Sequence, residues 1–413
     1  MKEQSKYVII GNSTAAVAAI EGIRSVDQTG GILVIGDEKH FVYGRPLISY
    51  YLLGTTDAER MHYRPETFYE DNGVALRLGV RAAKIDPAHK EVTLSDGSKF
   101  GYEKLLVATG SRPFDPPMEG IESVPQRFHF MTMDDALALE TVLAPDKKVL
   151  IVGAGLIGLK CLEGIAARVE SVAVVDLADR ILPSILDKTG ADMIQRTLEE
   201  HGATFYLSDS VSRFDGNTAH LKSGKEIPFD ILVVAVGVRP NTELVKEAGG
   251  EVVRGIVTDE CSRTSIPDAY AAGDCAESYD IATGTQRILA LLPNAYFQGH
   301  CAGVNMAGGS ERFDNAVAFN AIGFFGRHVL TAGAYTGETY TEQTADTYKV
   351  LFVKDNLLKG FILIDLPERA GVYTAMLRSR TPLSEIDAES LKQSPGWNAF
   401  PEKMRKEHFA KEV

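Results

Sequence analysis

Two similar glycine-rich turns occur in this chain, and each stands between a short apolar strand and the start of a helix. The first begins at Gly11 and reads Gly-Asn-Ser-Thr-Ala-Ala, and the second begins at Gly153 and reads Gly-Ala-Gly-Leu-Ile-Gly. Such a turn places backbone N–H groups and the positive end of a helix dipole where a pyrophosphate can bind. One turn of this kind is weak evidence, but two turns in one chain predict two bound dinucleotides.

An acidic residue closes the strand that follows each turn. Asp37 follows the first turn and Asp176 follows the second. A carboxylate at this position accepts hydrogen bonds from the hydroxyls of an adenosine ribose. It also repels a 2′-phosphate, so Asp176 favours NADH over NADPH. Arg180 could in principle compensate for that repulsion, but Asp179 stands beside it.

The first turn departs from the full glycine pattern and is supported by a second motif. Ser13 replaces the second glycine, but it is small and can donate a hydrogen bond to phosphate. Further along the chain, Gly273-Asp274 follows an expected strand at 269–271, where a carboxylate can bind a ribityl hydroxyl of a flavin. A helix N-cap at Asp274 is a compatible alternative. A helix around Ala295 could direct its positive end toward the flavin pyrimidine.

These sites together predict FAD on the first turn and NAD(H) on the second. Ala108-Thr-Gly-Ser-Arg-Pro113 and Ala235-Val-Gly-Val-Arg-Pro240 match each other, which indicates a duplicated nucleotide-binding domain. The fold class expected from the alternating strands and helices is α/β, with two doubly wound, Rossmann-like domains and a small α+β domain after them. We expect the FAD domain at 1–113 and 241–312, the NAD(H) domain at 114–240, and a C-terminal interface domain at 313–413.

Composition limits the functions that this chain can have. The net charge of −13 argues against nonspecific binding to nucleic acid or to an acidic membrane surface. No apolar run is long enough to span a bilayer, and no signal-peptide core precedes the first strand, so a cytoplasmic protein is expected. The four cysteines include no C-x-x-C pair, so neither a metal site nor an iron–sulfur cluster is predicted.

With these motifs, the chain resembles the FAD-dependent pyridine-nucleotide oxidoreductases over nearly its whole length. The resemblance is greatest to NADH:rubredoxin reductases, the flavin part of assimilatory nitrite reductases, and ferredoxin reductases. It includes Phe41-Val-Tyr-Gly-Arg-Pro-Leu-Ile-Ser49, Ala108-Thr-Gly110 and the Gly273-Asp274 step. The resemblance implies that Arg45 contacts FAD and that the C-terminal domain helps to form partner or subunit contacts over the flavin.

The sequence differs from that family at two places. Relatives that act through a thiol carry a redox cysteine near the stretch 45–50, and this chain has none there. Many relatives also pair a lysine and a glutamate near flavin N5, at the positions that here hold Tyr50 and Lys160. Lys160 could donate to the nicotinamide carboxamide or to flavin N5 and favour the reduced flavin. The alternative is an ordinary solvated helix lysine.

The candidate site residues follow from the motifs and the resemblance. The catalytic candidates are Lys160 and Tyr50. The FAD-binding candidates are Gly11, Ser13, Thr14, Ala15, Asp37, Arg45, Tyr50, Ala82, Ala108, Thr109, Gly110, Gly273, Asp274, Asn294 and Ala295. The NAD(H)-binding candidates are Gly153, Gly155, Ile157, Gly158, Asp176 and Gly237.

The leading hypothesis is an enzyme that moves electrons between NADH, FAD and an iron–sulfur carrier such as rubredoxin or a ferredoxin-like protein, or an iron–sulfur subunit of a complex. Flavin suits this task because it links two-electron and one-electron steps. The alternatives are a flavin-only NADH oxidase or peroxidase, and an FAD-loaded redox-sensing subunit of a complex. Neither a nucleic-acid nor a membrane partner is expected, and a homo-oligomer is left open.

Overall fold

The computed structural model describes residues 3–409, which form two compact units. The first unit comprises the chain up to 278 together with 292–313, and the second comprises 279–291 and the chain from 314 onward. The segment 279–291 lies within the sequence range expected for the FAD domain, and it groups with the C-terminal unit. Among residues 3–409, no helix has both the length and the apolar character needed to cross a membrane.

A seven-stranded sheet forms the centre of the first nucleotide-binding half. Its order is β3-β2-β1-β6-β5-β4, with β17 paired to β6. Strands β1, β2, β3, β6 and β17 are parallel, while β4 and β5 pair antiparallel. The strands are β1 (Glu3–Ile10), β2 (Ile32–Gly36), β3 (Val74–Leu78), β4 (Ala82–Asp86), β5 (Glu91–Leu94), β6 (Lys99–Val107) and β17 (Ala269–Ala271).

Both faces of this sheet are covered by apolar side chains. Along β1, Tyr7 and Ile9 join the cluster beneath α1 and α8, whereas Val8 and Ile10 join a second cluster on the opposite face. This explains why β1 is an unbroken apolar run rather than an alternating one. The helices of this half are α1 (Thr14–Val26), α2 (Ile48–Leu53), α3 (Phe68–Asp71), α7 (Glu243–Glu247) and α8 (Leu292–Met306).

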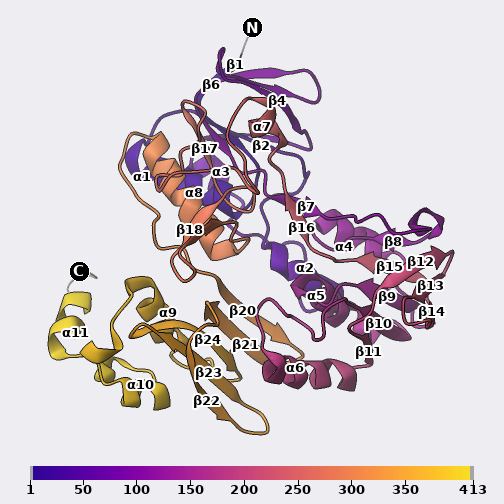
Figure 1. Cartoon of the computed structure of the whole chain (residues 1–413). Coiled ribbons are helices and arrows are strands. Elements are labelled where there is room, and N and C mark those ends of the chain that lie inside the picture. Colours follow the sequence, from indigo (N-terminus) through magenta and orange to yellow (C-terminus); the bar gives the residue numbers. More distant parts are fainter. Residues whose placement is uncertain (1–2, 410–413) are drawn as a thin grey trace. The chain divides into compact units, whose positions relative to one another are not determined.

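Helices α1 and α8 lie side by side because glycines line their contact (Figure 1). A Cβ added to Gly299 would lie 2.2 Å from the carbonyl oxygen of Ala15, and one added to Gly303 would lie 2.2 Å from that of Ala19. No side chain fits at either place, so the two backbones approach closely. This contact fixes the start of α1, which carries the first glycine turn.

A five-stranded parallel sheet in the order β11-β10-β9-β15-β8 repeats the scheme in the second half. Its strands are β8 (Arg127–Phe128), β9 (Lys148–Val152), β10 (Ser171–Val175), β11 (Ala203–Tyr206) and β15 (Ile231–Val234). Its helices are α4 (Met133–Glu140), α5 (Leu156–Ile165) and α6 (Lys188–Glu200), and β12 (Val211–Asp215), β13 (Thr218–Leu221) and β14 (Glu226–Pro228) form a separate sheet.

Two short strands join the halves. They are β7 (Ser111–Pro113) and β16 (Val238–Pro240), which pair antiparallel with Arg112 opposite Arg239. The two matching Gly-x-Arg-Pro segments of the duplication therefore pair with each other.

The C-terminal unit is an antiparallel sheet with helices after it, in the order β20-β21-β24-β23-β22. Asp355 and Asn356 both have positive φ and form the tight turn between β23 and β24. The strands are β20 (Phe319–Phe324), β21 (Arg327–Gly333), β22 (Glu338–Gln343), β23 (Tyr348–Lys354) and β24 (Leu357–Ile364), followed by α9 (Ala370–Ser379), α10 (Ala388–Gln393) and α11 (Glu402–Phe409). Two further strands, β18 (Ser278–Asp280) and β19 (Thr285–Arg287), form a hairpin. The fold class expected from the sequence is confirmed.

Candidate functional site

The first glycine turn is required by sterics. Gly11 has φ +116°, and a Cβ added there would lie 2.0 Å from the carbonyl oxygen of Ala108. Only glycine avoids both the strained conformation and the clash. Ser13 follows as the N-cap of α1, and its side chain makes no capping hydrogen bond to the described residues. The first N–H groups of α1 are thus left for another acceptor, as a pyrophosphate site needs.

A pocket surrounds this turn and brings most FAD-binding candidates together. Glu38 and Met131, which the sequence did not single out, also line it. The candidates among its lining residues are Gly11, Ser13, Thr14, Ala15, Asp37, Arg45, Ala108, Thr109, Gly110, Gly273, Asp274 and Ala295. Asn294 is a neighbour of Ala295 and is buried, but it is not among the lining residues of this pocket.

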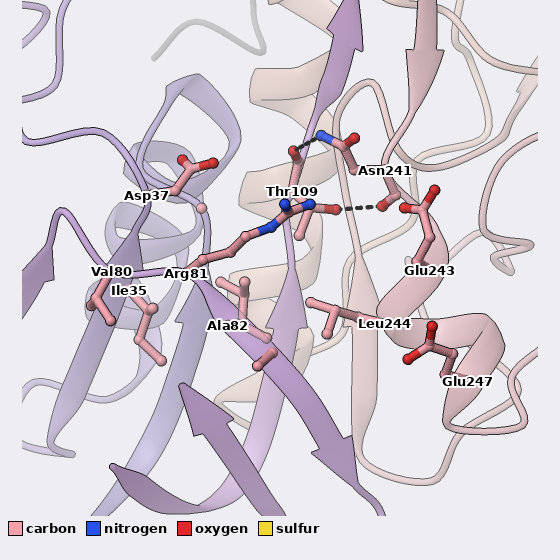
Figure 2. Close-up of a pocket in the computed structure, with 13 residues that line it drawn as sticks. Ile35, Asp37, Val80, Arg81, Ala82, Thr109, Asn241, Glu243, Leu244 and Glu247 are labelled. Carbon is pink, nitrogen blue, oxygen red and sulfur yellow. Dashed lines mark hydrogen bonds between the residues drawn. The ribbon is translucent and has the colours of Figure 1, made fainter. Parts of the chain in front are cut away.

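A second pocket continues from the same turn and shares Gly11, Asp37 and Thr109 with the first. Figure 2 shows Asp37 and Arg81 on one side of it and Glu243 on the other. The Thr109 hydroxyl donates to the carbonyl of Asn241, and the Asn241 amide donates to the Thr109 carbonyl, at 2.7 and 2.9 Å. These bonds tie the end of β6 to the chain that returns through β16.

The FAD-binding candidate Ala82 lines this second pocket, and Asp37 lines both pockets. An elongated dinucleotide needs a pyrophosphate cradle with a continuous groove on either side. The two pockets meet at the residues they share beside the glycine turn, and these residues fit FAD.

Arg45 is held in the first pocket by protein groups. Its guanidinium donates to Glu38 at 2.6 Å and to the Met131 carbonyl at 3.0 Å. Tyr43 donates to the same Glu38 carboxylate at 2.6 Å, and its hydroxyl accepts from the backbone of Met133. Sequence reasoning identified Arg45 but missed Glu38, although that acid directly follows Asp37.

Asp274 lies in the same pocket and is partly buried. Burial raises the pKa of Asp274, while a 3.0 Å hydrogen bond from Ser111 and the charge of Arg45 act in the opposite direction. A partly buried carboxylate in the pocket suits the hydroxyl groups of a ribityl chain. The N-cap alternative is wrong because the residues after Asp274 form a turn rather than a helix.

The turn before Asp274 is braced by α8. Gln298 accepts a 3.0 Å hydrogen bond from the backbone N–H of Gly273, and its amide donates to Ser278 at 2.7 Å. The side chain is buried. The sequence indicated that α8 belongs near this site but did not identify Gln298 as the brace.

The second glycine turn repeats the geometry of the first. Gly153 has φ +116°, and a Cβ added there would lie 2.3 Å from the carbonyl oxygen of Ala235. A Cβ on Gly158 would lie 2.1 Å from the carbonyl oxygen of Gly153, so this glycine allows the helix to pack onto the turn. By contrast, a Cβ on Gly155 would meet no described protein atom within 4 Å. Gly155 therefore leaves space beside the start of α5, which fits the close approach of a dinucleotide.

Asp176 is held in place by backbone hydrogen bonds, one of which comes from the second glycine turn. Its carboxylate accepts 2.6 Å and 2.7 Å hydrogen bonds from the backbone N–H groups of Ala154 and Ala178. Carboxylate oxygens have further lone pairs, so ribose hydroxyls can still be bound. Arg180 is paired with Asp179 at 2.7 Å and is therefore partly neutralised.

Two other NAD(H)-binding candidates can be placed in this half. Ile157 is in the first turn of α5, next to Gly158. Gly237 has φ +102°, and its carbonyl accepts a hydrogen bond from Phe114 in the chain that leaves β7.

The two catalytic candidates are in direct contact. The Lys160 ammonium lies 4.4 Å from the centre of the Tyr50 ring, where α5 packs against α2. The same ammonium forms an ion pair with Glu163, one turn further along α5. Both charged side chains are largely buried, so Lys160 is not the ordinary solvated lysine of the alternative interpretation. Sequence reasoning missed Glu163.

Thiol chemistry has little support in the described part of the chain. Cys161, Cys275 and Cys301 are buried, and no cysteine there is in a disulfide. Burial raises the pKa of Cys161, which keeps that thiol protonated and unreactive. No cluster of metal-ligating side chains is present among the described residues.

Comparisons with known proteins agree with this arrangement. The sequence pattern of a family described as pyridine nucleotide-disulphide oxidoreductase matches residues 5–299. The NADH-dependent phenylglyoxylate dehydrogenase subunit epsilon of Aromatoleum evansii is 33% identical over 398 residues, covering 93% of this chain and 94% of that protein. A rubredoxin-NAD(+) reductase of Pseudomonas putida is 32% identical over 309 residues, covering 73% of this chain and 80% of that protein.

A solved structure has the same fold. The crystal structure of the covalent putidaredoxin reductase–putidaredoxin complex superposes with a TM-score of 0.87 at 23% identity, covering 94% of this chain and 95% of that chain.

Proposed function

Because the chain belongs to the pyridine nucleotide-disulphide oxidoreductase family, we propose that it passes electrons from NADH through FAD to a one-electron iron–sulfur protein. It is an NAD(H)-dependent flavoprotein oxidoreductase, and its cofactors are FAD and NAD(H). The observation that carries the proposal is the presence of two nucleotide turns of the same geometry in one unit, at Gly11 and Gly153. The cysteines of the described residues are free, so no redox disulfide is found there.

Each half of the first unit has a defined task in this proposal. The Gly11 turn, Asp37, Arg45 and Asp274 would hold FAD, and the Gly153 turn with Asp176 would hold the nicotinamide dinucleotide. When bound, FAD supplies the link between two-electron and one-electron transfer. The protein residues bind and orient both molecules so that the reacting rings meet. One NADH would thereby reduce two carriers and yield NAD⁺ and a proton.

The choice of NADH over NADPH rests on three charges. A 2′-phosphate would approach the fixed carboxylate of Asp176, and Arg180 is already paired with Asp179. Like charges at close range oppose binding. The protein should therefore have a higher kcat/KM with NADH than with NADPH.

The acceptor class is supported by relatives named rubredoxin or ferredoxin reductases. A second candidate is the flavin subunit of a larger dehydrogenase, which the full-length match to the subunit epsilon favours. In that case, electrons would arrive from an iron–sulfur partner subunit and pass to NAD⁺. The cytoplasmic location and any homo-oligomer stay predictions from the sequence.

Anaerobic stopped-flow absorbance of the yellow protein tests the proposal. Rapid bleaching by NADH, followed by rapid reoxidation by rubredoxin or a ferredoxin, would establish a carrier reductase. Reoxidation by air alone would favour the oxidase alternative. Reoxidation only by an iron–sulfur subunit purified with the chain would favour the second candidate. A protein that is not bleached by NADH or NADPH would contradict the nicotinamide assignment.

A further inference from the structure

The contact between α2 and α5 contains a buried ion pair that the nucleotide turns themselves do not require. Lys160 and Glu163 are one turn apart on α5, and their side chains are 16% and 6% exposed. Two charges in such a place incur a desolvation cost that a pair of apolar side chains would avoid. The cost suggests a role beyond stability for the pair.

The packing of α5 on α2 determines where the ammonium lies. A Cβ on Gly164 would lie 2.8 Å from the carbonyl oxygen of Ser49, so the two helix backbones nearly touch at that point. Lys160 is one turn before Gly164 on the same face of α5. It therefore meets α2 at Tyr50, whose ring lies 4.4 Å from the ammonium. A cation at that distance from an aromatic face is attracted by the ring.

The same place is close in the chain to both nucleotide turns. Helix α2 follows Arg45 directly, and Arg45 lines the pocket of the first turn. Helix α5 starts at the second turn, and Lys160 is little more than one helical turn beyond the N-cap Gly155. The reacting ends of two dinucleotides held on these turns have to meet between the two halves, and the α2–α5 contact joins a helix that follows Arg45 to the helix that begins at the second turn.

We propose that Glu163 is a positioning residue that holds Lys160 against Tyr50, and that this ion pair tunes the reduction potential of bound FAD. This inference rests on the proposed function, because it assumes that FAD occupies the pocket of the first turn. Reduction adds negative charge to the flavin, so a nearby positive charge favours the reduced form and a nearby negative charge opposes it. The pair places one charge of each sign at a fixed position.

The signs of the expected shifts follow from charge alone. Lys160→Met removes a positive charge and should lower the midpoint potential. Glu163→Gln removes a negative charge, keeps the size of the side chain, and should raise the potential. We expect about a tenfold change in the two-electron equilibrium constant in each case, which is about 30 mV. The double variant should have a midpoint potential close to that of the wild type. Lys160→Arg keeps the positive charge, so its midpoint potential should also stay close to the wild-type value.

Spectroelectrochemical titration of the FAD-loaded variants, without any nicotinamide, tests the inference. Lys188→Met is the matched control, because Lys188 forms an intrahelical pair with Asp192 on α6, and both of these side chains are exposed. This variant should leave the potential unchanged. Opposite shifts in the two single variants and cancellation in the double variant are the expected result. Unchanged potentials, or shifts of the same sign, would overturn the inference while leaving the proposed function intact. A wild-type chain that takes up no FAD would overturn both.

Discussion

Arg45 donates a 2.6 Å hydrogen bond to Glu38 inside the pocket of the first glycine turn. A carboxylate in a site for an anionic pyrophosphate would repel the ligand if its charge were not balanced. The guanidinium both neutralises Glu38 and offers donors in a fixed orientation.

We predict that Arg45→Gln weakens FAD binding by about 10- to 100-fold, because it removes a charged donor and leaves Glu38 unbalanced. Fluorescence titration of the apoprotein with FAD measures this. Glu38→Gln combined with Arg45→Gln should recover part of the affinity. A double variant that binds FAD no better than Arg45→Gln would show that Glu38 does not repel the ligand.

We predict that Asp176→Ala raises the KM for NADH by about tenfold or more, through loss of the hydrogen bonds from a ribose to a charged acceptor. Bound FAD, measured by absorbance, should change little. The reciprocal variant Asp37→Ala should lose FAD and serves as the control. Loss of FAD from the Asp176 variant would mean that the two turns have been assigned the wrong way round.

We predict that Gly299→Ala destabilises the protein by about 1–3 kcal/mol, because the new methyl would overlap the carbonyl of Ala15 and separate α1 from α8. Thermal unfolding followed by circular dichroism measures the change. Gly31→Ala is the matched control, since a Cβ there meets no described atom within 4 Å. Equal melting temperatures for the two variants would contradict the close helix contact.

The fourth prediction concerns acid stability. Hydrogen bonds from Lys104 and Lys90, both 2.5 Å long, lower the pKa of Asp268. A lowered folded-state pKa contributes stability above the unfolded value of about 3.9 and loses it as pH falls through the folded value. Asp268→Asn should therefore cost about 1 kcal/mol at pH 7 and progressively less below about pH 4.

Urea unfolding at several pH values tests this prediction. Asparagine tolerates the φ of +61° at this position, so backbone strain should not obscure the result. A difference between wild type and variant that stays constant from pH 7 to pH 3 would exclude the ion pairs as its source.

The sequence predicted the parts of the site that depend on local sterics. Gly11 and Gly153 were identifiable because a tight turn against a neighbouring strand has no room for a side chain. The sequence therefore shows a glycine directly after each apolar strand. Asp37 and Asp176 were identifiable for a similar reason, since they end the next strand of the same unit.

The contacts between distant segments were not predictable in the same way. Gln298, in α8, accepts a hydrogen bond from the backbone of Gly273. Glu38 accepts one from Arg45 because the loop between them folds back on itself. Glu163 is only one turn from Lys160, yet its burial depends on α2, which comes from the other half of the first unit. Spacing in the sequence does not encode which polar side chains an approaching helix will enclose.

The pairing of β7 with β16 has a consequence for how the second sheet is attached. The chain leaves for that sheet through one strand and returns through the other, and the two strands lie edge to edge. The intervening segment is therefore connected to the first half through two neighbouring strands, and it also packs against that half where α5 meets α2. Because the entry and exit points of this segment are adjacent in β7 and β16, the segment between them could be replaced by the matching segment of a relative, with one junction in each strand.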